Sequence, residues 1–197
     1  MKKIFALLLI ALSMSVSESA WARSVNRTSA PDRLGKWDMG IGISAAANDG
    51  VDDAAYVSGS VSYGVTPYIA LGVEAGWQEA DGSDFNDESI GVVPVLFDVI
   101  VRWPNLHESI VPYGILGLGA IGVYATNENG AGARQGDDSD DTGFGWKLGG
   151  GIDWFLNERW IFNFEFAYLS ADVDVPTASV SSDYDFWTVG VALKYVF

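Results

Sequence analysis

Residues 183–197 read Asp-Tyr-Asp-Phe-Trp-Thr-Val-Gly-Val-Ala-Leu-Lys-Tyr-Val-Phe, and this stretch decides the fold. Every second residue from Trp187 to Phe197 is apolar, whereas the residues between them are mostly small or polar. This alternation predicts a β-strand with one apolar face and one face of small or polar side chains. The printed sequence ends on the aromatic Phe197. A strand of this kind is typical of a β-sheet whose apolar face does not meet water.

The other end of the chain predicts export from the cytoplasm. Lys2 and Lys3 precede an apolar run from Ile4 to Met14, and Ala20-Trp21-Ala22 has the small-x-small pattern of a cleavage site. Residues 1–22 are therefore expected to be a signal peptide, with Arg23 as the first residue of the mature chain. The run is shorter than the roughly 20 residues of a membrane-spanning helix.

The charge of the chain is strongly negative and unevenly placed. The formal net charge is −15, and there is no cysteine. Disulfides and thiolate metal sites are therefore excluded, and nucleic acid is an unfavourable partner. Four segments hold 16 acids against one base, Arg134, and are expected to be loops. These segments are Asn48 to Asp53, Glu79 to Glu88, Ala125 to Thr142 and Ser170 to Asp183.

Between and around these loops lie eight segments with strand-like alternation. They are residues 36–45, 56–65, 68–78, 90–103, 111–124, 143–155, 160–169 and the final stretch. The acidic loops follow every odd-numbered segment, and short turns follow every even-numbered one except the last. This asymmetry predicts an all-β, eight-stranded, antiparallel, up-and-down transmembrane β-barrel, with short periplasmic turns and long outer loops.

The tryptophans indicate which face of the barrel meets lipid. All seven tryptophans after the signal peptide fall on the apolar parity of their segments, near segment ends. Aromatic residues form girdles at both interfaces of membrane barrels. The predicted girdle consists of Trp37, Trp77, Trp103, Trp146, Trp154, Trp160 and Trp187.

Charged residues occupy the opposite parity and are expected to point into the barrel, because a lipid-facing charge is costly. They are Asp38, Glu74, Asp98, Arg102, Lys147, Asp153, Glu165 and Lys194. An eight-stranded barrel has room only for side chains inside, so these groups must pair. The sequence predicts a closed polar core with a salt-bridge network and no aqueous channel.

Two segments are harder to interpret. Residues 111–124 are rich in glycine and have ambiguous facing, and we place Tyr113, Ile115, Ile121 and Val123 on the lipid face. Residues 23–35 are polar and slightly basic, and are expected to be a flexible periplasmic lead-in. A plug inside the barrel is the alternative for this segment. Residues 36–197 then form the barrel domain.

The chain resembles the small outer-membrane barrels typified by OmpX and the OmpA transmembrane domain. The stretches that carry the resemblance are Val111 to Gly114, Gly143 to Asp153, Phe155 to Trp160, Glu165 and Tyr195 to Phe197. The resemblance implies location in the bacterial outer membrane and folding by the outer-membrane assembly machinery, which reads the last strand. Tyr195 and Phe197 are the assembly signal by this resemblance. Ala192 stands where the family usually has glycine, with Gly190 nearby.

Two motifs suggest other functions. His107-Glu108-Ser109 contains the His-x-Ser spacing of a lipid A deacylase barrel, but it lies in a predicted periplasmic turn, away from lipid A in the outer leaflet. Gly35-Lys36-Trp37 matches the opening of lipocalins, which are soluble eight-stranded barrels. That reading would require the tryptophans to fit inside the barrel. We therefore predict no catalytic residues and a membrane barrel.

The expected role is structural or interactive, through acidic loops at the cell surface, with a narrow solute or ion pore and a lipid-modifying enzyme as alternatives. No cofactor is expected. The expected partners are outer-membrane lipid, lipopolysaccharide and the assembly machinery, and the barrel is expected to be a monomer. Residues 81–88 and 137–141 are candidates for weak Ca²⁺ or Mg²⁺ binding, although neither has EF-hand spacing.

Overall fold

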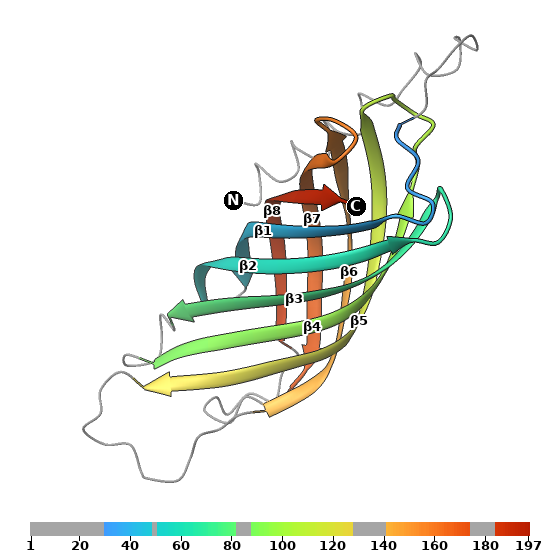
Figure 1. Ribbon diagram of the computed structural model, residues 1–197. Coiled ribbons are helices and arrows are strands. Elements are labelled where there is room, and N and C mark those ends of the chain that lie inside the picture. Colours follow the sequence, from blue (N-terminus) through green and yellow to red (C-terminus); the bar gives the residue numbers. More distant parts are fainter. Residues whose placement is uncertain (1–29, 49–50, 82–87, 128–140, 174–183) are drawn as a thin grey trace.

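The computed structural model describes residues 30–48, 51–81, 88–127, 141–173 and 184–197. The expected signal peptide and the centres of the acidic loops lie outside these residues. The described residues form one closed antiparallel barrel with the strands in sequence order, as predicted (Figure 1). The strands are β1 (Trp37–Asn48), β2 (Val51–Gly64), β3 (Ile69–Asp81), β4 (Glu88–Arg102), β5 (Ile110–Asn127), β6 (Asp141–Phe155), β7 (Trp160–Asp172) and β8 (Tyr184–Val196).

The C-terminal strand closes the barrel against the first strand. β8 pairs with β1 from Asp38 opposite Val196 to Ala47 opposite Trp187. The amide of Phe197 extends this contact by donating to the carbonyl of Trp37 at 2.9 Å. Closure leaves no free sheet edge, which is a requirement for a sheet inside a bilayer because every backbone group must be paired there.

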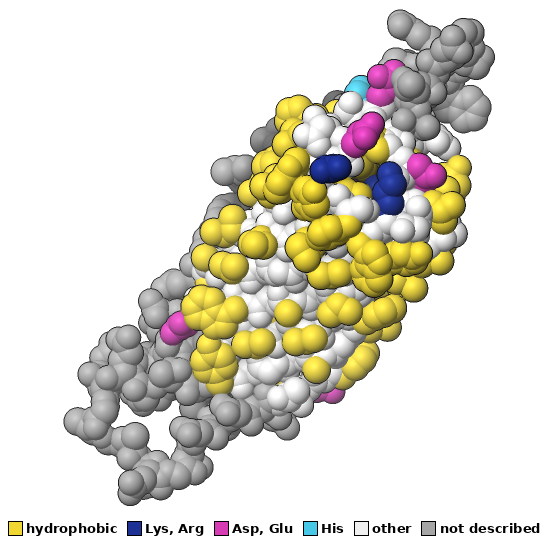
Figure 2. All heavy atoms as spheres, viewed as in Figure 1, with side chains coloured by type: hydrophobic (Ala, Val, Ile, Leu, Met, Phe, Trp, Pro, Cys, Tyr) yellow, Lys and Arg dark blue, Asp and Glu magenta, His cyan; other side chains and the backbone are white. Residues whose placement is uncertain are grey.

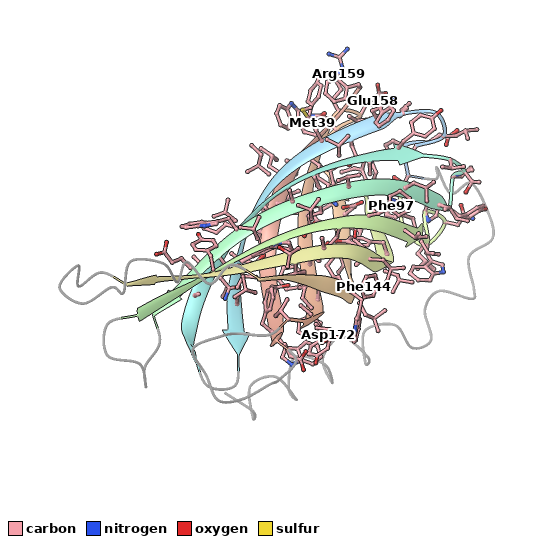
Figure 3. The ribbon with its side chains drawn as sticks, turned by 90° about the horizontal axis from the view of Figure 1, so that it is seen from below. Met39, Phe97, Phe144, Glu158, Arg159 and Asp172 are labelled. Carbon is pink, nitrogen blue, oxygen red and sulfur yellow. The ribbon has the colours of Figure 1, made fainter. Side chains whose placement is uncertain are left out.

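Outward side chains cover the barrel with an apolar surface. On β1 and β3 the exposed face carries the predicted residues, including Met39, Ile41 and Val73. Figure 2 shows apolar side chains across the visible wall, with charged side chains gathered toward its ends. In Figure 3, Met39, Phe97 and Phe144 project from the outside of the ribbon. This surface suits the hydrocarbon core of a membrane.

The first acidic segment forms less of a loop than the sequence predicted. β1 continues to Asn48 and β2 begins at Val51, where these two residues pair. The prediction of a loop over residues 48–53 was therefore wrong for most of its length. Backbone pairing does not depend on the side chain, so an acidic strand end can stay in the ladder. The connections at this end of the barrel, called the loop end, otherwise include the long acidic segments.

The facing assigned to the fifth strand was wrong. Tyr113, Ile115, Ile121 and Val123 point into the barrel, and all are nearly inaccessible to solvent. Leu116 and Leu118 face outward instead, at 45% and 47% exposure. Apolar residues occupy both faces of β5, so alternation alone could not assign its direction.

Residues 30–36, called the N-terminal segment, precede β1 and are packed in the opposite end of the barrel. This end is called the turn end, because residues 65–68, 103–109 and 156–159 connect strands there. Ala30 and Arg33 are buried there, so the part of the expected flexible lead-in that the structure describes packs against the barrel, while residues 23–29 lie outside the described residues. Gly35 adopts a left-handed backbone conformation, with φ of 72°, that turns this segment into β1.

None of the described segments forms a helix with the length and apolarity needed to traverse a lipid bilayer.

Candidate functional site in the barrel interior

An apolar layer closes the turn end of the barrel. Ala30 from the N-terminal segment packs there with four side chains of the wall, which are Val111, Phe155, Ile161 and Val196. The guanidinium carbon of Arg33 lies 5.9 Å from the centre of the Phe155 ring. The N-terminal segment therefore contributes to the packing of the barrel mouth and brings a cation into it.

Above this layer lies a group of five buried charges. Arg33 is hydrogen-bonded and ion-paired to Asp38, which also accepts from the Ser62 hydroxyl at 2.6 Å. Lys194 Nζ donates to Asp153 Oδ1 at 3.1 Å. Arg102 lies between the two pairs, with a nitrogen 3.7 Å from an oxygen of each aspartate.

Burial lowers the pKa of the Arg33 guanidinium from its ordinary value, and the Asp38 carboxylate opposes that shift. An arginine stays protonated in proteins despite such a shift, because its ordinary pKa lies far above neutral pH. The N-terminal segment therefore holds a permanent positive charge inside the barrel.

A second group of charges centres on Lys147, which is almost completely buried. Lys147 Nζ donates to Glu74 Oε2 at 2.7 Å and to Glu165 Oε1 at 3.4 Å. Asp98 lies farther from this cation, at 3.9 Å. Three carboxylates thus surround one ammonium group. We call the two groups together, with their nine charges, the charged belt.

Two interior tyrosines support the glutamates of the charged belt. The Tyr56 hydroxyl donates to Glu74 Oε1 at 3.0 Å, and the Tyr113 hydroxyl donates to Glu165 Oε2 at 2.6 Å. Asn163 links the two groups of charges, because its amide donates to Tyr113 at 2.9 Å and to Asp153 at 2.8 Å.

Each of these tyrosines lies over a glycine of a neighbouring strand. A Cβ atom on Gly76 would lie 2.1 Å from the Tyr56 hydroxyl oxygen, and one on Gly151 would lie 2.7 Å from that of Tyr113. Neither ring could keep its position beside a larger residue. The glycines therefore allow the tyrosines to reach their glutamates.

An apolar layer fills the interior toward the loop end. We call it the apolar cap, and it consists of Ala46, Tyr56, Val92, Leu96, Ile121, Val123, Ala167, Leu169, Ala171, Val173 and Phe186. The Phe186 ring packs edge-on against Tyr56 with centroids 6.2 Å apart. The prediction of a polar core therefore describes only part of the interior, since this layer is hydrophobic.

A small cavity of about 50 Å³ runs beside the charged belt. Its wall includes the hydroxyls of Ser44, Ser58 and Ser60, together with Glu74 and Lys147. This volume holds a few water molecules, at ~10–15 Å³ each. Thr188 and one member of the apolar cap, Leu169, also line this cavity.

All eight charged residues singled out in the sequence point inward, and the structure brings them together in the charged belt. Sequence reasoning missed Arg33, Tyr56 and Tyr113. Arg33 precedes the alternating pattern, so its direction could not be inferred. A signal for Tyr56 was its position on the polar parity of its segment, beside the serines.

The seven tryptophans point outward in two bands. Trp37, Trp103, Trp154 and Trp160 lie toward the turn end, and Trp77, Trp146 and Trp187 lie toward the loop end. In the second band the indole of Trp77 donates to the Tyr124 hydroxyl at 2.7 Å. Tyr168 lies between Trp146 and Trp187, with ring centroids 5.4 and 4.7 Å away.

The residues expected to form the assembly signal lie at the turn end of the barrel wall. Tyr195 packs edge-on against Trp160 and against Phe197, with centroids 4.9 and 5.1 Å apart respectively. Phe197 is 62% exposed. Glu158 and Arg159 occupy the adjacent turn, as Figure 3 shows.

The remaining candidate sites are not assembled in the part of the chain that the structure describes. His107 is exposed, and its Nδ1 accepts from the Ser109 amide at 3.1 Å. No cluster of three or more metal-ligating side chains is present among the described residues. The central parts of both acidic candidates for Ca²⁺ or Mg²⁺ lie outside them.

Comparison with solved structures finds the same architecture at low sequence identity. Neisserial surface protein A has a TM-score of 0.60 and 11% identity, with 82% of this chain and 96% of that chain covered. OprG from Pseudomonas aeruginosa has a TM-score of 0.51 and 19% identity, with 84% and 97% covered. Ail from Yersinia pestis has a TM-score of 0.52 and 13% identity, with 83% and 99% covered. These likenesses establish the fold alone.

No match was found among curated proteins. The model of the family described as "Outer membrane protein beta-barrel domain" matches residues 4–197. This match agrees with the closed barrel, the apolar outer wall and the paired charges inside. The chain thus belongs to the outer membrane protein β-barrel domain family and is a small β-barrel of the bacterial outer membrane.

Proposed function

We propose that this protein is a closed membrane platform that presents acidic loops at the cell surface. The observation that supports this most strongly is the filling of the interior. Val92, Leu96 and Ile121 are at most 1% exposed, although they lie inside a barrel rather than between packed layers. Because nothing can pass through a barrel that is blocked along its axis, its outer loops are the part of the protein that is available to bind partners.

The charge of the loops defines the class of partner. Since the four acidic segments hold 16 acids against one base, they repel other anions unless a cation lies between. Carboxylate oxygens are ligands for Ca²⁺ and Mg²⁺. We therefore propose that divalent cations bridge the loops to phosphate groups of lipopolysaccharide.

The names of two of the structurally similar proteins support a role at the cell surface. One is Neisserial surface protein A, and the other is Ail, described as the attachment invasion locus protein. Ail is also known in complex with the heparin analogue sucrose octasulfate. Because the loops of this chain are acidic, we expect it not to bind that sulfated sugar.

The loop proposal is tested with the barrel reconstituted in vesicles. Binding of lipopolysaccharide is measured with and without millimolar Ca²⁺, for the native chain and for a variant with Asp137, Asp138, Asp140 and Asp141 changed to Asn. Calcium should increase binding to the native chain, and the variant should lose most of that increase. The control is Glu108→Gln, which removes an acid from a turn at the opposite end. Calorimetry that detects no heat with millimolar Ca²⁺ contradicts the bridge.

A narrow pore is the second candidate, and the cavity lined by Ser44, Ser58 and Ser60 favours it. For ions to pass, both the apolar cap and the layer at the turn end would have to open. Conductance of the reconstituted barrel distinguishes the pore from the closed platform. We propose no enzymatic activity, because His107 lies in a turn at the periplasmic end.

The last strand supports a further part of this proposal. Tyr195 and Phe197 lie together on the outer wall at the periplasmic end, where assembly factors have access. We propose that they are read by the assembly machinery and that the folded barrel is a monomer. Phe197→Ala should reduce the amount of folded barrel in the outer membrane without changing refolding of the purified chain in vesicles.

A further inference from the structure

Two buried arginines at the periplasmic mouth of the barrel have donors without acceptors. Arg102 is 2% exposed, yet its Nε, Nη1 and Nη2 atoms make no hydrogen bond to any described residue. Arg33 is 4% exposed, and its Nε and Nη1 atoms likewise make no hydrogen bond to any described residue. Burying N–H groups of a cation without acceptors is costly, so an acceptor from outside the protein is favoured here.

The charges around these arginines are not balanced. In this part of the charged belt three cations, Arg33, Arg102 and Lys194, share two carboxylates, those of Asp38 and Asp153. Asp153 accepts a hydrogen bond from Lys194 at 3.1 Å but lies 3.7 Å from Arg102. Taken alone, this group carries one excess positive charge, whereas the Lys147 group beside it has three carboxylates and one cation. It is therefore the unpaired donors of the two arginines, rather than the net charge of the belt, that favour an anion here.

A cavity of about 220 Å³ has both arginines among the residues of its wall. It is formed between residues 30–33 and the turns that follow β2 and β4, and its wall includes Pro31, Arg33, Tyr68, Arg102, Asn105 and Phe155. The Asn105 amide donates to the Tyr68 hydroxyl at 3.2 Å. The space is many times the ~10–15 Å³ that one water molecule needs in a cavity, so it can hold a polyatomic anion with water.

The backbone around Arg33 is fixed in place by close contacts. The amide of Leu34 donates to Asp32 Oδ1 at 2.9 Å, and the amide of Gly35 donates to the Gly64 carbonyl at 2.8 Å. A Cβ atom on Gly64 would lie 2.0 Å from the carbonyl oxygen of Arg33. Gly64 therefore allows this segment to enter the mouth, and the site is preorganised rather than formed by a loose tail.

We propose that this pocket binds a small periplasmic oxyanion of the phosphate class, held between Arg33 and Arg102. The planar donor fork of a guanidinium group matches two oxygens of such an anion. Asp32 lines the same cavity and opposes the anion, but it is exposed at the solvent edge, where water and salt weaken its charge. The site lies inside the mouth, so a free anion reaches it more directly than a lipid headgroup.

The test uses the full barrel refolded in a maltoside detergent that contains no phosphate. Binding of inorganic phosphate is followed by ³¹P line broadening at constant ionic strength, with chloride as the background anion. Arg33→Gln and Arg102→Lys should each weaken binding about tenfold or more, because each removes charged hydrogen bonds. Asp32→Asn should strengthen binding. The matched control is Arg159→Gln, an exposed arginine in another turn, which should change nothing.

Folding of each variant is checked by heat-dependent gel mobility. If Arg102→Lys does not fold, Arg33→Gln, Asp32→Asn and Gly64→Ala still test the site, since Gly64→Ala displaces Arg33 without removing a charge. Phosphate binding that persists in detergent and is unaffected by added phosphatidylethanolamine supports a free anion. If that lipid competes with phosphate for the pocket, the proposal that the ligand is a free anion is contradicted. Absence of phosphate binding to the native barrel, or equal binding by Arg33→Gln and the native barrel, means that the cavity holds only water and overturns the proposal.

Discussion

The charged belt and the apolar cap fill the same barrel by different physical means. In the charged belt, Lys147 is 1% exposed and is stabilised by hydrogen bonds from its ammonium group to Glu74 and Glu165. In the apolar cap, Leu96 is also 1% exposed, but it contributes packing and transfer from water alone. The two side chains are equally buried, so burial alone does not describe what each contributes.

The difference concerns what happens when one member is removed. Loss of one partner from a buried ion pair leaves an uncompensated charge, whereas loss of a buried apolar side chain leaves a cavity. The first effect depends on ionisation and on the remaining partners, and the second depends on volume. The belt and the cap should therefore respond differently to substitution.

The largest effect is expected for Lys147→Met. This change leaves the carboxylates of Glu74 and Glu165 without their shared cation, so the free energy of unfolding should fall by ~3–5 kcal/mol. Reversible urea unfolding in lipid vesicles measures the loss. Adding Glu74→Gln to this variant should recover part of the loss, because one uncompensated charge disappears. A loss below 1 kcal/mol in the single variant would show that Lys147 does not hold the belt together.

A somewhat smaller loss is expected for Leu96→Ala in the apolar cap. The cavity it leaves should lower the free energy of unfolding by ~2–5 kcal/mol, since truncating a buried leucine costs both transfer and packing. The matched control is Leu118→Ala, because Leu118 faces outward from the neighbouring strand. If both variants lose the same stability, the cap does not behave as a packed core.

Gly76→Ala tests the junction between belt and cap. The new methyl group would overlap the Tyr56 ring, which belongs to the cap and donates to Glu74 of the belt. We expect a loss of ~1–3 kcal/mol from overpacking, measured by the same unfolding experiment. Gly59→Ala is the control, since its nearest atom lies 3.9 Å away. Equal losses in both variants would indicate a general cost of replacing glycine.

The smallest effect is expected for Asp98→Asn. Asp98 lies 3.9 Å from Lys147, and its Oδ1 accepts no hydrogen bond from the described residues. Removing its charge relieves repulsion from the neighbouring glutamates, so stability should change by less than ~1 kcal/mol or increase. Glu74→Gln provides the contrast, with an expected loss of ~1.5–3 kcal/mol for its charged hydrogen bonds. A greater loss for Asp98→Asn than for Glu74→Gln contradicts this ranking.

The fold could be predicted from the sequence because most strands carry a charge or a glycine-serine pattern on one face. In β3, Glu74 and Gln78 mark the inner parity, and Trp77 marks the outer one. A strand shifted by one residue would turn its charged side chains toward lipid. The free-energy cost of charges in lipid therefore excludes the shifted register. The up-and-down strand order then follows from the alternation of short turns with longer loops.

The interior could be predicted only in part. Leu96 and Ile121 lie on inner faces of strands whose outer faces are also apolar, and their parity therefore carries no signal. For this reason the sequence did not predict the apolar cap, and the prediction for the facing of β5 was wrong. Arg33 precedes the first strand, and its position depends on the turn at Gly35 and the close approach to Gly64, which a linear pattern does not show.

The most direct test of the closed barrel is conductance and heat-dependent gel mobility measured on the same reconstituted sample. The charged belt, with Lys147 and Arg102 across the axis, and the apolar cap above it should together prevent ion flow. We expect a gel shift that demonstrates a folded barrel, without conductance steps in a planar lipid bilayer. Reproducible conductance steps from the same folded sample would contradict the closed interior and favour the narrow pore.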